Sequence, residues 1–149
     1  MEFKHPKDAQ SYFRLMREKQ WFQYDFDAYY LCLMAGLHFR RLGKPEMVGN
    51  AFIDHYPGAY VDAAQSIAGL LIDAELDRQQ ILQTRDSIEK LIISLLDLRS
   101  KTFLSDEGMN LLNRYAAGGL ELIRDRIPPT PDMEVFLVHY HNLLNEQTA

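Results

Sequence analysis

The chain has 149 residues and a formal net charge of −5, with 47% hydrophobic and 25% charged residues. This length and composition fit one globular domain with a core, and they exclude a disordered or low-complexity chain. The negative charge argues against a protein whose main task is to coat nucleic acid or an anionic membrane. We therefore expect a single domain over residues 1–149.

The N-terminal residues predict a first helix. Pro6 can begin it, because the missing N–H of proline has no partner at the first helical position. Tyr12, Phe13 and Met16 then give the helix one apolar face, and it should end near Gln20.

Residues 21–42, WFQYDFDAYYLCLMAGLHFRRL, form the most informative segment of the chain. Six aromatic side chains fall within its first ten residues, and the ten residues 28–37 carry no charge. Acidic residues precede this run, whereas Arg40 and Arg41 follow it, which is the order that the helix macrodipole favours. The segment predicts a central apolar helix over 25–42 that ends at Gly43.

The middle of the chain begins with an irregular stretch. Residues 44–58 have no clear period, so a short helix over 46–56 fits them, while residues 50–56 are the best strand candidate of a sequence without a useful alternating pattern. Apolar residues then recur at helical spacing, which predicts a long helix over 59–80.

Two further helices have recognisable starting residues. Thr84 or Asp86 can cap a helix that continues to about Arg99, because short polar side chains accept hydrogen bonds from the first free N–H groups. Ser105 caps the next helix for the same reason.

The helix that begins at Ser105 contains an unusual glycine pair. Each glycine inside a helix costs about 1 kcal/mol relative to alanine, so Gly118-Gly119 indicates a close crossing, a kink or a break. After a proline-rich connector, Thr130 and Pro131 begin a last helix that should dock on the core. These patterns together predict an all-α fold, a single compact bundle of five to seven helices around the helix 25–42.

The sequence contains no convincing catalytic or metal-binding set. Its five histidines do not stand at the i, i+3 or i, i+4 spacings of helical metal sites. Cys32 lies in the apolar helix, where burial makes a thiol inert. Asp73 and Asp77 fit a solvated helix face better than an acid–base pair, and no glycine-rich phosphate loop occurs. We therefore expect no catalytic residue, metal or cofactor, and an enzyme is the least favoured of the hypotheses.

A basic segment offers one possible binding function. Residues 38–44 read HFRRLGK and contain Arg40, Arg41 and Lys44, to which Arg124 and Arg126 add if the helices lie side by side. Arginine suits contact with phosphate and stacking on bases. The alternative hypothesis is therefore an accessory protein that contacts nucleic acid through this patch, for example in a prokaryotic nucleic-acid-processing or phage-defence system.

The aromatic segment supports the favoured hypothesis, a non-catalytic interaction or scaffold subunit of a larger assembly. Aromatic side chains that stay on a surface are typical centres of protein interfaces. The candidate residues are Trp21, Phe22 and Tyr24, with Phe136 and Tyr140 of the last helix ranked lower. We expect either self-association or binding to another protein.

The compartment follows from three absences in the sequence. A single cysteine cannot form an intrachain disulfide, which indicates a reducing compartment. The first residues, MEFKHPKDAQ, lack the apolar segment of a signal peptide. No apolar run approaches the ~20 residues that cross a bilayer. We expect a cytoplasmic protein that does not bind membranes.

Overall fold

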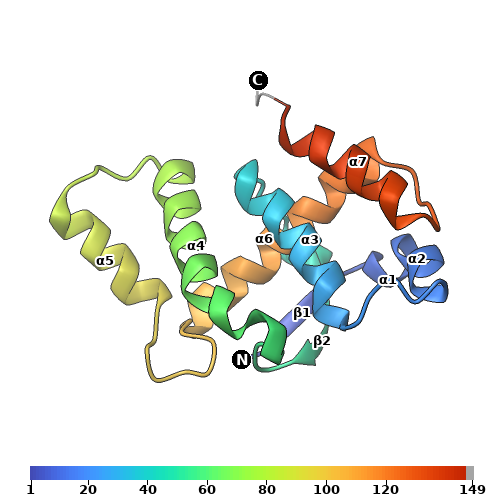
Figure 1. Ribbon diagram of the computed structural model, residues 1–149. Helices are drawn as coiled ribbons and strands as arrows, with labels where there is room; N and C mark the ends of the chain where they lie inside the picture. The colour runs from blue at the N-terminus through green and yellow to red at the C-terminus, as the bar shows by residue number, and fades with distance from the viewer. Residues whose placement is uncertain (147–149) are drawn as a thin grey trace.

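The computed structural model describes residues 1–146, which are mostly helical (Figure 1). In chain order the elements are β1 (Phe3–Pro6), α1 (Ala9–Tyr12), α2 (Arg14–Glu18), α3 (Asp25–His38), the 3-10 helix η1 (Pro45–Met47), β2 (Val48–Ile53), the 3-10 helix η2 (Gly58–Ala63), α4 (Ala64–Arg78), α5 (Arg85–Leu95), α6 (Asp106–Arg126) and α7 (Met133–Leu144). In Figure 1, α4 and α5 lie on one side of the paired helices α3 and α6, and α7 lies with α1 and α2 on the other. None of the helices within residues 1–146 is both long and apolar enough to span a membrane.

The expectation of a strictly all-α fold is wrong, because β1 and β2 form a small antiparallel sheet. Pro6 ends a strand instead of beginning a helix, and the predicted first helix is replaced by β1 and the short helices α1 and α2. The predicted helix over 46–56 is also wrong, since η1 is followed directly by β2. The strand candidate 50–56 therefore lay close to the real strand.

Strand β1 is bonded to a residue that is distant in the sequence, Asn113. The side-chain amide of Asn113 in α6 accepts a hydrogen bond from the backbone N–H of Lys4 at 3.0 Å and donates one to the carbonyl of Glu2 at 3.0 Å. These bonds hold an extended backbone against α6. A local sequence pattern does not contain this information, because the partners are more than one hundred residues apart.

Helices α3 and α6 cross so closely that glycine is required at the crossing. A Cβ atom on Gly119 would lie 1.7 Å from the carbonyl oxygen of Cys32, and a Cβ atom on Gly36 would lie 1.8 Å from that of Tyr115. Side-chain carbon atoms do not approach backbone atoms to such distances. Of the three interpretations of Gly118-Gly119, the close crossing is confirmed, because α6 continues through the pair without a break.

Helix α3 ends four residues earlier than expected. It stops at His38, and Arg40 takes a left-handed backbone conformation with φ of 52°. Gly43 is not a helix cap, because its N–H donates instead to the carbonyl of Arg114 in α6 at 2.8 Å. The segment after α3 is therefore fixed by contacts with other helices.

The caps of the later helices are mostly as predicted. Thr84 caps α5 by accepting from the N–H of Ser87, and Ser105 caps α6 by accepting from the N–H of Gly108. Helix α5 ends at Leu95 and not near Arg99, because the chain then forms an isolated β-bridge. The predicted long helix over 59–80 is divided into η2 and α4, and the cap of α7 is Asp132 rather than Thr130.

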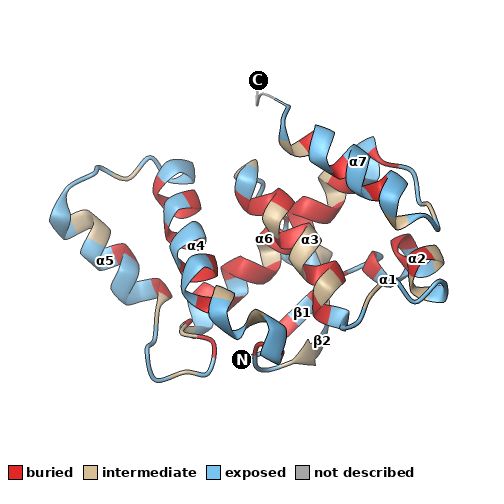
Figure 2. Ribbon diagram, viewed as in Figure 1, coloured by how far each residue is buried: buried red, intermediate tan, exposed pale blue. Residues whose placement is uncertain are grey.

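Buried residues concentrate on the facing sides of α3 and α6 and on the inner sides of α4 and α7 (Figure 2). Helix α5 is pale blue along most of its length in the same view, so it contributes little to the core. Only Leu91 and Leu95 of α5 are fully buried. This contrast directs attention to the surface of α5.

Candidate interaction surfaces

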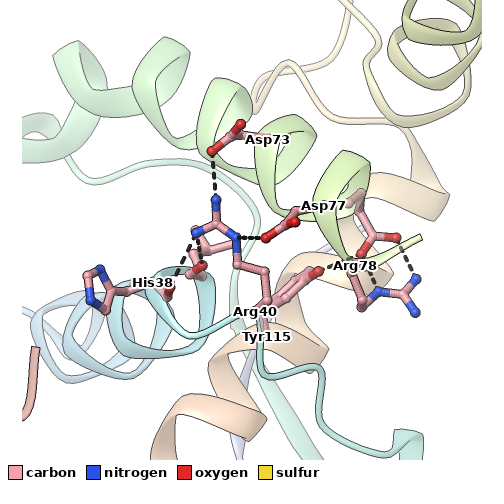
Figure 3. Close-up of polar contacts among 8 residues, drawn as sticks. His38, Arg40, Asp73, Asp77, Arg78 and Tyr115 are labelled. Atoms are coloured by element: carbon pink, nitrogen blue, oxygen red, sulfur yellow. Dashed lines mark hydrogen bonds and ion pairs between the residues drawn. The ribbon is translucent and has the colours of Figure 1, made fainter. Parts of the chain in front are cut away.

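Arg40 forms the polar contact that joins α3 to α4 (Figure 3). Its guanidinium donates to Asp73 at 2.8 Å and to Asp77 at 3.1 Å, and also to the carbonyl oxygens of Leu37 and His38. The left-handed backbone at Arg40 turns the chain so that the side chain reaches α4. Asp73 and Asp77 thus serve as partners of an arginine, and the positive charge of Arg40 is balanced within the chain.

The charges of the other candidate nucleic-acid contacts, apart from that of Lys44, are likewise paired with carboxylates of the same chain. Arg41 pairs with Glu121, Arg124 with Asp8, and Arg126 with Glu146. Lys44 is exposed and takes part in none of the ion pairs found within residues 1–146. Four of the five candidate cationic side chains therefore already have a carboxylate partner within the chain.

Of the candidate aromatic residues, Trp21 and Tyr24 lie on the surface. Trp21 is 49% exposed, and its indole N–H donates to the carbonyl of Pro131 at 2.9 Å, which fixes the ring beside the start of α7. Tyr24 is less exposed. Phe22 is half-buried, with its ring edge-to-face against Phe13.

Phe136 and Tyr140 are core residues in this conformation. Phe136 is fully buried and its ring stacks on that of Tyr140, with 5.7 Å between ring centres. The hydroxyl of Tyr140 donates to the carbonyl of Leu31 in α3 at 2.6 Å. Both side chains hold α7 on the body of the protein and are not available to a partner. Their spacing of four residues is that of one helix face, and this spacing alone does not distinguish a face that docks within the chain from one that docks on another chain.

A surface that the sequence did not single out surrounds α5. Leu82, Ile93 and Leu98 are 74%, 77% and 79% exposed, the highest values among the large apolar side chains of residues 1–146. Ile92 is exposed beside them. We refer to these four residues, Leu82, Ile92, Ile93 and Leu98, as the α5 surface.

The sequence contained a signal for this surface. Helical spacing places Ile92 and Leu98 on one broad apolar face with Leu91 and Leu95, but residues 91–93 are three apolar residues in a row. Consecutive helical residues point about 100° apart, so three of them cover more of the circumference than one neighbouring helix can bury. The extra apolar residues must therefore face outward.

The loop after α5 is held in one conformation. Leu96 forms an isolated β-bridge with Leu104, and the N–H of Asp97 donates to the carbonyl of Phe103 at 2.9 Å. Phe103 has φ of 65°, a left-handed conformation that is strained for a bulky residue by about 1–3 kcal/mol. These contacts fix the turn that carries the exposed side chain of Leu98.

The base of α5 is tied to the start of α6. A Cβ atom on Gly108 would lie 2.1 Å from the carbonyl oxygen of Leu95, so the two backbones touch. The hydroxyl of Ser105 donates to the carbonyl of Ser94 at 2.7 Å. The α5 surface is therefore presented by a fixed element.

No family model, no curated protein and no solved structure matches this chain. The assignment of function therefore depends on the geometry of the chain alone.

Several hydrogen-bond donors surround the buried carboxylate of Glu75 in α4. Its carboxylate accepts from Arg78 at 2.6 Å and 2.8 Å, from Gln79 at 2.8 Å and from the hydroxyl of Tyr115 in α6. Burial alone would raise the pKa of Glu75, but these hydrogen bonds outweigh it and hold the pKa below its usual value. A carboxylate held ionised by several donors joins α4 to α6 and is unsuited to general acid catalysis.

Two other titratable groups are shielded from solvent. Cys32 is fully buried, as predicted, and burial raises the pKa of its thiol. His5 is 6% exposed and stacks on Phe52 with 3.8 Å between ring centres. Burial, assisted by the charge of Arg17, lowers the pKa of His5 to about 4. Within residues 1–146 no group of three or more His, Cys, Asp or Glu side chains is arranged to hold a metal ion.

Proposed function

We propose that the protein is a non-catalytic interaction subunit of a larger cytosolic assembly, and that it binds a protein partner through the α5 surface. One observation carries this proposal: the three most exposed large apolar side chains of residues 1–146 belong to α5 and its two ends, since Ile93 lies in α5, Leu82 three residues before it and Leu98 three residues after it. Exposed apolar side chains that gather in one region mark interaction sites, whereas scattered ones need no explanation.

The energetics support an interface at this position. Full burial of a leucine or isoleucine side chain contributes about 1.5–3 kcal/mol, so a partner that covers the α5 surface gains several such contributions. The loop that carries Leu98 is closed by the hydrogen bond from the N–H of Asp97 to the carbonyl of Phe103. Because the loop is already ordered, a partner that binds there causes little further loss of conformational entropy.

The charge distribution favours this proposal over nucleic-acid contact. The arginines of the candidate basic patch are each paired with a carboxylate, and the whole chain carries a net charge of −5. Binding to nucleic acid would have to break those ion pairs. Trp21 and Tyr24, on the far side of the molecule from α5, remain candidates for a second protein contact.

The experiment replaces Ile93 with aspartate and compares it with a matched control. Val138 of α7 is also exposed, at 60%, so Val138→Asp makes the same chemical change on another helix. The tagged wild-type protein and both variants are expressed in the native host, and the proteins that co-purify are quantified by mass spectrometry. We expect Ile93→Asp to lose the main partner and Val138→Asp to retain it.

Circular dichroism then establishes that both variants remain folded, since both changes are on the surface. A second variant, Leu98→Asp, should lose the same partner as Ile93→Asp. The proposal fails if no protein co-purifies with the wild type, or if the partner is retained when both Ile93 and Leu98 are replaced.

A further inference from the structure

Trp21 and the start of α7 enclose a hollow that is separate from the α5 surface. The hollow has a volume of about 460 Å³ and is lined by Lys19, Trp21, Pro131, Asp132 and Glu134. Trp21 is the only tryptophan of the chain, and it is among the exposed large side chains of residues 1–146. Two segments that are 110 residues apart in the sequence therefore meet at this hollow.

The ring of Trp21 is held in place by the chain itself. Its indole N–H donates to the carbonyl of Pro131 at 2.9 Å, and its backbone N–H donates to the carbonyl of Met16 at 3.3 Å. Residues 128–131 read PPTP, so the indole N–H is bonded to a stiff segment of backbone. A ligand therefore finds the ring already in position, and its binding causes little further loss of conformational entropy.

The same contacts determine what Trp21 offers to a ligand. The indole N–H is the only hydrogen-bond donor of this side chain, and it is already bonded to Pro131. The exposed ring carries a negative electrostatic potential over its face, and tryptophan is the aromatic side chain that attracts cations most strongly in this way. The ring is therefore suited to a cation and has no free donor for an anion.

Two carboxylates belong to the lining of the same hollow. Oδ1 of Asp132 caps α7 by accepting from the N–H groups of Glu134 and Val135, while Oδ2 accepts none of the hydrogen bonds found within residues 1–146. Glu134 and Lys19 are exposed and take part in none of the ion pairs of that part of the chain. Both carboxylates can thus accept hydrogen bonds from a ligand.

We propose that this hollow binds the side chain of an arginine on a protein partner. The guanidinium group stacks on the ring of Trp21 and donates to the carboxylates of Asp132 and Glu134. Arginine fits better than lysine, because its planar group both stacks on aromatic rings and bonds to two acceptors at once. The net charge of −5 also attracts a basic partner from a distance.

Lys19 opposes this binding and allows a test of sign. Its ammonium group belongs to the same lining, so it repels a cation and attracts an anion. Removing the charge of Lys19 should strengthen the binding of arginine, whereas removing that of Glu134 should weaken it. An anionic ligand would respond in the opposite way to both changes. Because the hollow is separate from the α5 surface, this inference does not depend on the proposed function.

The fluorescence of Trp21 measures binding in the intact protein, because the chain contains no other tryptophan. The wild type is titrated at constant ionic strength with N-acetyl-arginine amide and with N-acetyl-citrulline amide, which has nearly the same shape but no charge. We expect a saturable change with the arginine compound, in the millimolar range because a single side chain makes few contacts. The citrulline compound should bind at least tenfold more weakly.

Variants with one changed side chain then assign the contacts. Glu134→Gln should weaken binding of the arginine compound by about three- to fivefold, and Lys19→Gln should strengthen it by a similar factor, since both charges are exposed. Glu107 is an exposed acidic residue in the first turn of α6, so Glu107→Gln makes the matched change on another helix and should leave binding unaltered.

The role of the ring is tested without its fluorescence. Trp21→Leu is titrated with the arginine compound while the backbone amide signal of Glu134 is followed by NMR, and binding should weaken by about fivefold because the cation–π contact is lost. Circular dichroism establishes that each variant remains folded.

Three results would overturn the inference. One is the absence of a saturable change in the wild type with the arginine compound. Another is equal affinity for the arginine and citrulline compounds, because charge would then play no part. The third is a reversal of sign, in which Lys19→Gln weakens binding and Glu134→Gln strengthens it.

Discussion

Replacing Gly119 with alanine places a methyl group inside the closest contact of the fold. The new Cβ atom would lie 1.7 Å from the carbonyl oxygen of Cys32 and 2.7 Å from the backbone nitrogen of Gly36. To reach a separation of even 3.0 Å, the carbonyl oxygen must retreat by about 1.3 Å. Since backbone atoms and not a flexible side chain are in the way, α3 and α6 must move apart.

The magnitude follows from two opposing effects. Overpacking of a core costs typically 1–3 kcal/mol and more where the backbone must shift, while alanine is favoured over glycine inside a helix by about 1 kcal/mol. Because backbone atoms must shift here, we expect an overpacking cost of about 4 kcal/mol, above the typical range, and hence a net loss of about 3 kcal/mol in the free energy of unfolding. For a chain of this length the melting temperature then falls by roughly 6–12 °C.

Denaturant unfolding followed by circular dichroism measures this loss, and Gly69 supplies the control. A Cβ atom on Gly69, in α4, would meet nothing within 4 Å. Gly69→Ala should therefore stabilise the protein by about 0.5–1 kcal/mol through helix propensity alone. If Gly119→Ala unfolds at the same denaturant concentration as the wild type, the close crossing of α3 and α6 is refuted.

Two further predictions concern charge. Burial lowers the pKa of His5 from 6.5 to about 4, so the folded state disfavours the charged ring. The unfolded chain therefore takes up a proton at this residue before the folded protein does. The contribution of His5 to the free energy of unfolding is complete above about pH 6.5 and is lost as the pH falls toward 4. His5→Phe should flatten the dependence of unfolding free energy on pH in that interval, and an unchanged slope would contradict the assignment. Fluorescence anisotropy with labelled single- and double-stranded DNA and RNA at low salt should detect no binding, because Arg40 and Arg41 are already paired with carboxylates. Binding that weakens steeply with salt and disappears in the double variant Arg40→Glu, Arg41→Glu would establish the nucleic-acid alternative instead.

The sequence predicted those features of the fold that depend on residues close together in the chain. Thr84 and Ser105 cap helices because a short polar side chain meets free N–H groups wherever a helix begins. The glycine pair in α6 indicated a close crossing because glycine inside a helix is otherwise unfavourable. The burial of Cys32 followed from its uncharged neighbours.

Features that depend on distant residues were not predictable in this way. Strand β1 pairs with β2 and is bonded by Asn113 of α6, and Arg40, just after the end of α3, bonds to the acidic residues of α4. Among the candidate site residues, helical spacing places Phe136 on an apolar face of the last helix. It does not indicate whether that face packs on the core of the same chain, as it does, or on a partner. The run of apolar residues 91–93 indicates that one of them faces outward, but only the positions of the other helices decide that Ile93 is the most exposed of the three.

The side chain of Asn113 has a consequence for the order of folding. Besides its bonds to Lys4 of β1 and to Glu2 just before β1, it accepts a hydrogen bond from the hydroxyl of Tyr29 in α3 at 2.8 Å. One amide of α6 is thus bonded to α3 and to the N-terminal strand. Closing such distant contacts requires a large loss of chain entropy, which slows folding compared with bundles built from neighbouring helices. Strand β1 can pair with β2 as soon as β2 is synthesised, but the bonds that hold β1 against α6 can form only after residue 113 has left the ribosome.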